Sequence, residues 1–113
     1  MAIEYNSRLA VDKWIKQYPS AASSLSADEF AGVLNKVLFS MEQGAVAREL
    51  VSGLGSGVLN TSYIVAAMEA CPFSKPTLVT TMAPYVSDPE NKEIVLSELY
   101  SYERGEAEKA FAR

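Results

Sequence analysis

The chain has no histidine and only one cysteine, Cys71, among its 113 residues. Without histidine, Ser-His-Asp and Cys-His catalysis are excluded, and so are the usual ligand sets of zinc sites. A single cysteine excludes an intramolecular disulfide and fits a reducing compartment. Cys71 comes directly before Pro72, where a helix should end, so we interpret it as a buried structural thiol rather than a nucleophile.

Basic residues are also few, because ten Lys and Arg stand against fourteen Asp and Glu, for a net charge of −4. This balance argues against a nucleic-acid partner. The first residues are interrupted by charges, unlike an export signal, and the longest weakly charged stretch, residues 51–68, is too polar and glycine-rich to cross a bilayer. We therefore expect a cytoplasmic protein without a membrane partner.

Apolar spacing predicts helices along the whole chain, since no alternating run is long enough for a sheet. The strongest pattern begins after Ser26 and Glu29, which have the spacing of a capping box. Six apolar residues then share one helical face, namely Phe30, Val33, Leu34, Val37, Leu38 and Met41. We expect a helix from Ala27 through Met41, which Gly44 either kinks or separates from a second helix.

Proline, glycine and capping residues divide the rest of the chain. Residues 20–26 are expected to form a linker and the glycine-rich run 53–57 a structural turn. The remaining expected boundaries are an end at Pro19, a start at Asn60 or Thr61, an end at Pro72, a start at Ser74 with Pro76 in the first turn, an end or kink at Pro84, and a start at Asp88 for a last helix reaching Ala110.

These boundaries predict an all-α fold, a single domain over residues 1–113 built as one compact bundle of five or six helices. We find no repeat at a fixed period. The last turns, residues 104–113, are expected to project from the bundle or to fray. Around the helix from Ala27 we expect Trp14, Ile15, Leu50, Ile64, Met68, Leu78, Val79, Val95 and Leu99.

Catalytic and metal-binding patterns are weak. The Gly53-x-Gly55-x-Gly57 run has neither a preceding strand nor a following Lys-Ser or Lys-Thr pair, so it is no phosphate loop. The acidic residues near the end, Glu103, Glu106 and Glu108, lack the spacing of a calcium loop and are typical of a solvated helix end. We expect no catalytic residue, no metal and no cofactor.

Phe39 is an apolar residue on the wrong face. It lies opposite the apolar stripe of the helix from Ala27, in a row with Gly32, Asn35 and Gln43. Aromatic residues outside the core are enriched at interfaces, so this row predicts contact with another protein. The alternative is that the helix is central and covered on both faces within the chain.

The expected last helix carries two rows. Val95, Leu99 and Tyr102 form a stripe that packs on the bundle, whereas a second row repeats every third or fourth residue. That second row is Leu96, Tyr100, Glu103, Ala107 and Phe111. It predicts a homodimer in which this helix pairs with its counterpart, unless the end of the chain is a solvated tail that merely exposes Phe111.

By elimination, we expect a non-catalytic protein-binding module rather than an enzyme: an adaptor, inhibitor, immunity or accessory protein of bacterial or phage type. Its partner is another protein, and the predicted partner-binding residues are Phe39, Gln43, Asn35, Leu96, Tyr100 and Phe111. The alternative is a small-ligand-binding protein or enzyme that uses carboxylates and tyrosines in a cleft between helices.

Overall fold

A computed structural model describes residues 7–37 and 40–112, and this part of the chain is helical without any strand. The predicted all-α class is thus confirmed. The predicted number of helices is too low, because eight α-helices form in the described residues. They are α1 (Ser7–Gln17), α2 (Pro19–Ser23), α3 (Ala27–Asn35), α4 (Ser40–Gly53), α5 (Thr61–Ala70), α6 (Lys75–Met82), α7 (Lys92–Leu96) and α8 (Arg104–Phe111).

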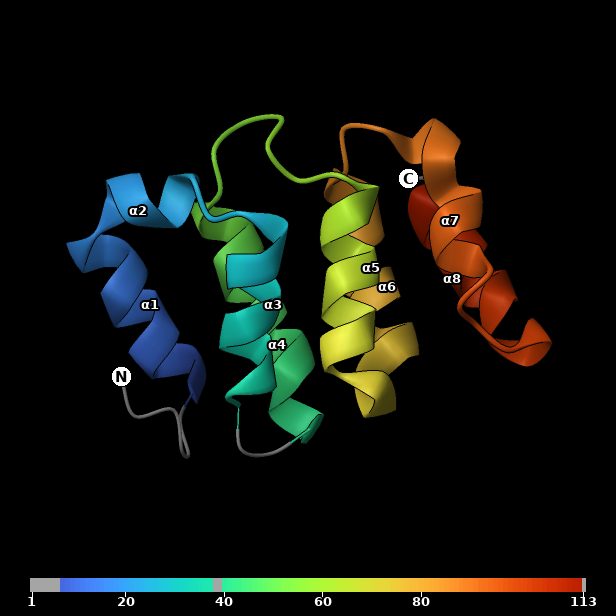
Figure 1. Cartoon of the computed structure of the whole chain (residues 1–113), viewed down its shortest axis with the longest axis horizontal. Coiled ribbons are helices and arrows are strands. Elements are labelled where there is room, and N and C mark those ends of the chain that lie inside the picture. Colours follow the sequence, from blue (N-terminus) through green and yellow to red (C-terminus); the bar gives the residue numbers. More distant parts are fainter. Residues whose placement is uncertain (1–6, 38–39, 113) are drawn as a thin grey trace.

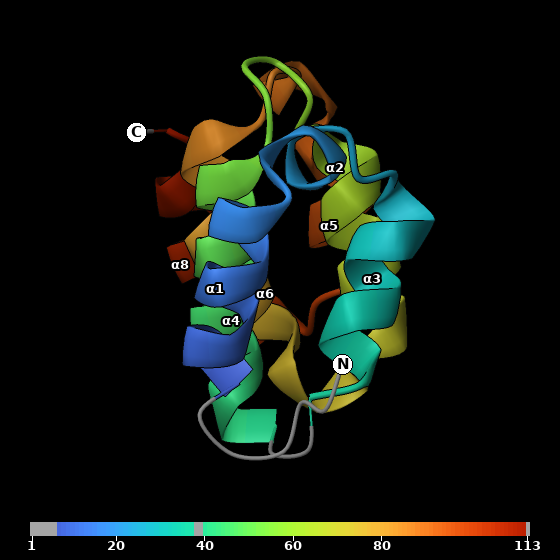
Figure 2. The same ribbon diagram turned by 90° about the vertical axis from the view of Figure 1, so that its left-hand side faces the viewer.

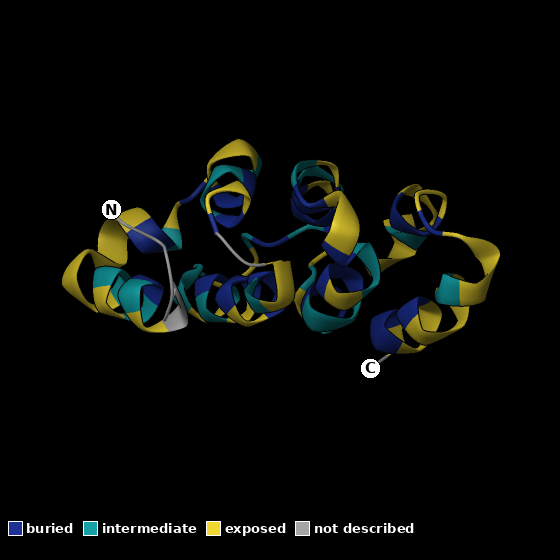
Figure 3. Cartoon of the chain, turned by 90° about the horizontal axis from the view of Figure 1, so that it is seen from below, coloured by how far each residue is buried: buried dark blue, intermediate teal, exposed yellow. Residues whose placement is uncertain are grey.

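The helices form two layers rather than a bundle around one central helix (Figures 1 and 3). Helices α3, α5 and α7 lie side by side in one layer, and α1, α4, α6 and α8 in the other. Three successive hairpins, α3–α4, α5–α6 and α7–α8, each contribute one helix to each layer, so the helices of one layer run opposite to those of the other (Figure 1). The hairpins differ in length, which explains why no fixed period is visible in the sequence.

The core lies between the layers. Phe30 of α3 and Tyr63 of α5 meet edge to face with ring centroids 5.7 Å apart, and the Tyr63 hydroxyl donates a hydrogen bond to the Leu25 carbonyl. Burying one such large apolar side chain stabilises the fold by roughly 1.5–3 kcal/mol. The largest fully buried side chains are Phe30, Leu34, Leu50, Ile64, Met68, Leu78, Met82, Leu96, Val11, Val46, Val79 and Val95.

The helix predicted from Ala27 through Met41 is wrong beyond Asn35, where α3 ends. Its start is confirmed, because the Glu29 amide donates to Ser26 Oγ and the Ser26 amide to Glu29 Oε1. Val37 is still buried although it follows the helix, whereas Met41, the second residue of α4, is 89% exposed. Val37 keeps the spacing of the apolar stripe past the end of α3, so the pattern could not show the break. Leu38 lies outside the described residues.

Proline positions give mixed results. Pro72 and Pro84 follow the ends of α5 and α6 as predicted, and Pro76 lies in the first turn of α6. Pro19 follows the end of α1 as predicted, but it is also the first residue of α2, which occupies most of the stretch predicted as a linker. This role is physically reasonable, since the first turn of a helix does not need the missing proline N–H.

The single last helix predicted from Asp88 to Ala110 is also wrong. The chain forms a 3₁₀ turn at Pro89–Asn91, then α7, then a reversal before α8. The Tyr100 amide donates to Glu103 Oε1 at 3.0 Å, which helps to start the returning segment. Residues 104–111 neither project nor fray, because α8 packs on α6 and α7 and buries Phe111.

Candidate interaction surfaces

Two of the predicted partner-binding residues have internal hydrogen bonds. Asn35 Nδ2 donates to the Ala70 carbonyl at 3.1 Å, which links the end of α3 to the end of α5. Gln43 is buried, donates to the Leu34 carbonyl at 3.4 Å and accepts from Ser74 Oγ at 2.6 Å. Both side chains therefore tie the turns between helices together. Phe39 lies outside the described residues.

The three predicted residues of the last helix are not brought together on one exposed row. Leu96 of α7 is 1% exposed and Phe111 of α8 is 7% exposed, so both belong to the core. Tyr100, in the reversal between these helices, is 72% exposed. The predicted seam thus does not exist as a surface, because the helix that would carry it folds back on itself. Homodimerisation itself stays a prediction.

A different set of apolar side chains is exposed where the hairpins reverse. Phe73 lies in the 3₁₀ turn Pro72–Ser74 and is 91% exposed. Tyr102 was predicted to pack on the bundle but is 82% exposed, and its ring stacks on that of Tyr100 with centroids 5.8 Å apart. Met41 lies in the first turn of α4, directly after the α3–α4 reversal. We call these four residues, Met41, Phe73, Tyr100 and Tyr102, the aromatic edge.

The aromatic edge follows from the topology. All three reversals, between α3 and α4, α5 and α6, and α7 and α8, lie along the same edge of the two layers, the lower one in Figure 1 and the one facing the viewer in Figure 3. Phe73 has anchored residues on both sides: Cys71, two residues before it, is buried, and Ser74 after it is buried and donates a hydrogen bond to Gln43. The backbone at this position is thus fixed while its ring faces solvent.

A groove with a volume of about 560 Å³ runs between α4 and α6, on the outer face of the layer that contains these two helices. Its floor is narrow because a Cβ on Gly44 would lie 2.6 Å from Thr77 Cγ2. Its walls carry Arg48, Glu49 and Tyr85, together with threonines of α6. The groove is therefore mainly polar and offers one carboxylate and one tyrosine from the set that the alternative prediction requires.

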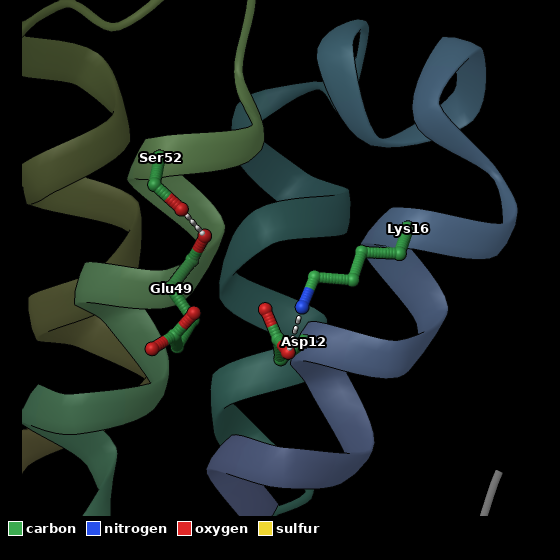
Figure 4. Close-up of polar contacts among 4 residues, drawn as sticks. All are labelled: Asp12, Lys16, Glu49 and Ser52. Atoms are coloured by element: carbon green, nitrogen blue, oxygen red, sulfur yellow. Dashed lines mark hydrogen bonds and ion pairs between the residues drawn. The ribbon is translucent and has the colours of Figure 1, made fainter.

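The polar contacts within α1 and near the end of α4 are local. Asp12 and Lys16 of α1 form the ion pair expected from their spacing, with 3.0 Å between Asp12 Oδ2 and Lys16 Nζ (Figure 4). Ser52 Oγ donates to the backbone carbonyl of Glu49 at 2.6 Å on the facing helix (Figure 4). An exposed ion pair such as Asp12–Lys16 contributes only about 0.3–0.5 kcal/mol to stability. These contacts therefore add little to the packing of α1 on α4 and do not form a site.

Three titratable groups have shifted pKa values for structural reasons, and in the first, Tyr63, burial raises the pKa of the hydroxyl. Burial raises the pKa of the Cys71 thiol, which agrees with its interpretation as an inert side chain. Burial also acts to raise the pKa of the Asp88 carboxyl, but hydrogen bonds from Asn91 and from the Thr61 hydroxyl and amide lower it overall. Asp88 thus caps the start of α5 rather than a helix of its own.

Neither a metal centre nor a membrane span is found in the described part of the chain. Residues 7–37 and 40–112 hold no group of three or more acidic or cysteine side chains placed to share a metal ion. None of the helices described there has the length and apolar character needed to cross a bilayer.

Comparison with known families gives one match. The model of the family described as "Domain of unknown function (DUF4476)" matches residues 20–111. The chain belongs to this family. No curated protein and no solved structure matches the chain. The DUF4476 segment starts one residue into α2 and contains α3 to α8, and hence the whole aromatic edge and the α4–α6 groove, whereas α1 precedes it.

Proposed function

We propose that this DUF4476 chain is a non-catalytic protein-binding module that holds another protein against its aromatic edge. The observation that carries the proposal is the exposure of four large apolar side chains where the three hairpins reverse, while the core between the layers is filled by others. Tyrosine, phenylalanine and methionine are enriched at the centres of protein interfaces, and such anchors supply most of the binding energy.

The geometry of the edge supports a rigid anchor. Tyr100 and Tyr102 stack with only 4° between their ring planes, so each ring restrains the other before any partner arrives. A preformed pair loses little conformational freedom on binding. Phe73 presents another exposed ring on the neighbouring reversal, between α5 and α6. A partner can therefore be held at two points.

Capture from the native host tests this proposal. The tagged chain is compared with a double variant, Phe73→Ser with Tyr102→Ser, and with the control Ile94→Ser, which removes another apolar side chain that is 55% exposed on α7. We expect the wild type and Ile94→Ser to retain the same partner and the double variant to lose it, with unchanged helical circular dichroism. Equal capture by all three proteins would contradict the proposal.

The alternative of a small-ligand-binding protein has weaker support. The α4–α6 groove is lined by Glu49 and Tyr85 as that alternative requires, but threonines and Arg48 make up most of its other polar lining. A thermal-shift screen of small metabolites decides between the two. A ligand whose stabilising effect disappears in Tyr85→Ala but persists in the double edge variant would favour the groove.

A further inference from the structure

The two layers end unevenly beside α1. Helices α4, α6 and α8 each have a hairpin partner in the opposite layer, namely α3, α5 and α7. Among the described helices, α1 has only the five-residue α2 as a neighbour of this kind, and α2 bridges α1 and α3 at one end (Figure 2). Below α2, a pocket of about 360 Å³ opens between α1 and α3. We call this pocket the end slot.

The end slot has an apolar floor and, beside Gly32, space that no described atom fills. Val11 of α1 and Leu50 of α4 are each 1% exposed and form the floor, while Trp14 and Val33 are half-buried at its sides. Gly32 of α3 also lines the slot, and a Cβ built there would meet no described atom within 4 Å. The slot therefore has room for apolar side chains that this part of the chain does not supply.

The charges at the slot indicate which way an occupant would run. Two charged residues of α3 line it: Glu29 in the first turn, near α2, and Lys36 just after the last residue. A helix N-terminus carries partial positive charge and a C-terminus partial negative charge. A helix parallel to α3 would place its N-terminus beside Glu29 and its C-terminus beside Lys36, and this is the direction shared by the helices of that layer.

We propose that the end slot binds one amphipathic helix of a partner protein, parallel to α3, as the missing neighbour of α1 in that layer. The helix inserts apolar side chains spaced three and four residues apart over Val11 and Leu50. A basic residue in its first turns faces Glu29, and an acidic residue in its last turn faces Lys36. This surface is separate from the aromatic edge, so it provides a second point of assembly and does not rest on the proposed function.

Selection from a displayed library of random 16-residue peptides tests the proposal on the full chain. Gly32→Trp fills the slot, and Gly105→Trp is its matched control, because Gly105 also has no described atom within 4 Å of a built Cβ and lies on the exposed side of α8. We expect enriched peptides to carry a helical apolar stripe and to bind wild type and Gly105→Trp equally. They should bind Gly32→Trp at least about tenfold more weakly, a difference near 1.4 kcal/mol.

A charge reversal provides a second variant that keeps the test independent of how Gly32→Trp folds. Lys36 is exposed, so Lys36→Glu leaves the core intact. We expect selection on this variant to replace the acidic residue near the peptide C-terminus by a basic one. The double edge variant, Phe73→Ser with Tyr102→Ser, should bind the selected peptides as wild type does, which separates failure of this proposal from failure of the proposed function.

Three results would overturn the proposal. The first is enrichment of peptides without helical spacing, and the second is equal binding of the selected peptides to Gly32→Trp and wild type. The third is a wild-type dimer in light scattering at about 100 μM that Gly32→Trp, but not Gly105→Trp, converts to a monomer, which would assign the slot to a second copy.

Discussion

Helix α3 has two faces of opposite character. The face toward α5 buries Phe30 and Leu34 completely, and α3 and α5 pack closely along their lengths. The face toward α1 carries Gly32 and the half-buried Val33 and borders the end slot. One helix thus shows this layer with and without a neighbouring helix among the described residues. Stability should therefore depend more on the first face than on the second.

The largest loss of stability should come from a substitution on the face of α3 that packs on α5. Leu34→Ala removes a side chain that is 0% exposed, so lost burial and the resulting cavity should cost about 2–5 kcal/mol in a urea titration. Val33→Ala, on the adjacent residue but the open face, should cost less than about 1.5 kcal/mol. Equal losses would show that the two faces do not differ and that the end slot is closed in solution.

A second prediction concerns how closely α4 and α6 pack at Gly44. Gly44→Ala places a methyl group 2.6 Å from Thr77 Cγ2, so α4 and α6 must separate or Thr77 must move. We expect a loss of roughly 1–3 kcal/mol from this overpacking, larger than any gain in helix propensity. The double variant Gly44→Ala with Thr77→Ser removes the opposing methyl group and should recover most of the loss. If the double variant is as unstable as Gly44→Ala, contact with the Thr77 methyl group is not the cause of the loss.

A third effect concerns α5, the helix that closes the first face of α3. Asp88 Oδ1 accepts from the Thr61 amide and Asp88 Oδ2 from the Thr61 hydroxyl, both at 2.8 Å, so Asp88→Ala should cost about 1 kcal/mol at neutral pH. Its folded pKa is lowered, so this stabilisation is present above the ordinary value of 3.8 and is lost as the pH falls below it. Urea titrations of wild type and Asp88→Ala should therefore converge in acid.

Glu90→Ala provides the control for Asp88→Ala. Glu90 is exposed and also lies in the segment before α7. Its removal should change the unfolding free energy by less than about 0.5 kcal/mol at either pH. If Glu90→Ala shows the same pH-dependent loss, general acidity of this segment rather than the bond to Thr61 determines the effect.

The sequence predicted those parts of the fold that are specified locally. The capping box of Ser26 and Glu29 requires only residues within one turn and forms as expected, and of the two predicted caps for α5, Asn60 and Thr61, Asn60 is the one that forms. The reversal after Leu96 was missed because Ser97 to Tyr100 contains neither glycine nor proline. The cap of α5 by Asp88 was missed because it depends on residues far apart in the chain.

The candidate surfaces were less predictable for a related reason. Phe73 follows Pro72 and precedes the start of α6, so it belongs to no helical stripe, and an aromatic residue in such a turn was the signal available. Tyr102 fitted a stripe that assumed one continuous helix, and the reversal turned it outward. The end slot has no sequence signature, because its lining comes mainly from α1, α3 and α4 and only the fold brings these residues together.

The smallest effect tests whether the slot is open without any partner. Replacing glycine by alanine inside a helix stabilises by roughly 0.5–1 kcal/mol when the new methyl group meets no obstacle. Gly32→Ala and Gly105→Ala should therefore raise the unfolding free energy by similar amounts in urea titrations, since a Cβ at either position has no described atom within 4 Å. A loss at Gly32 together with a gain at Gly105 would mean that other residues fill the slot in solution.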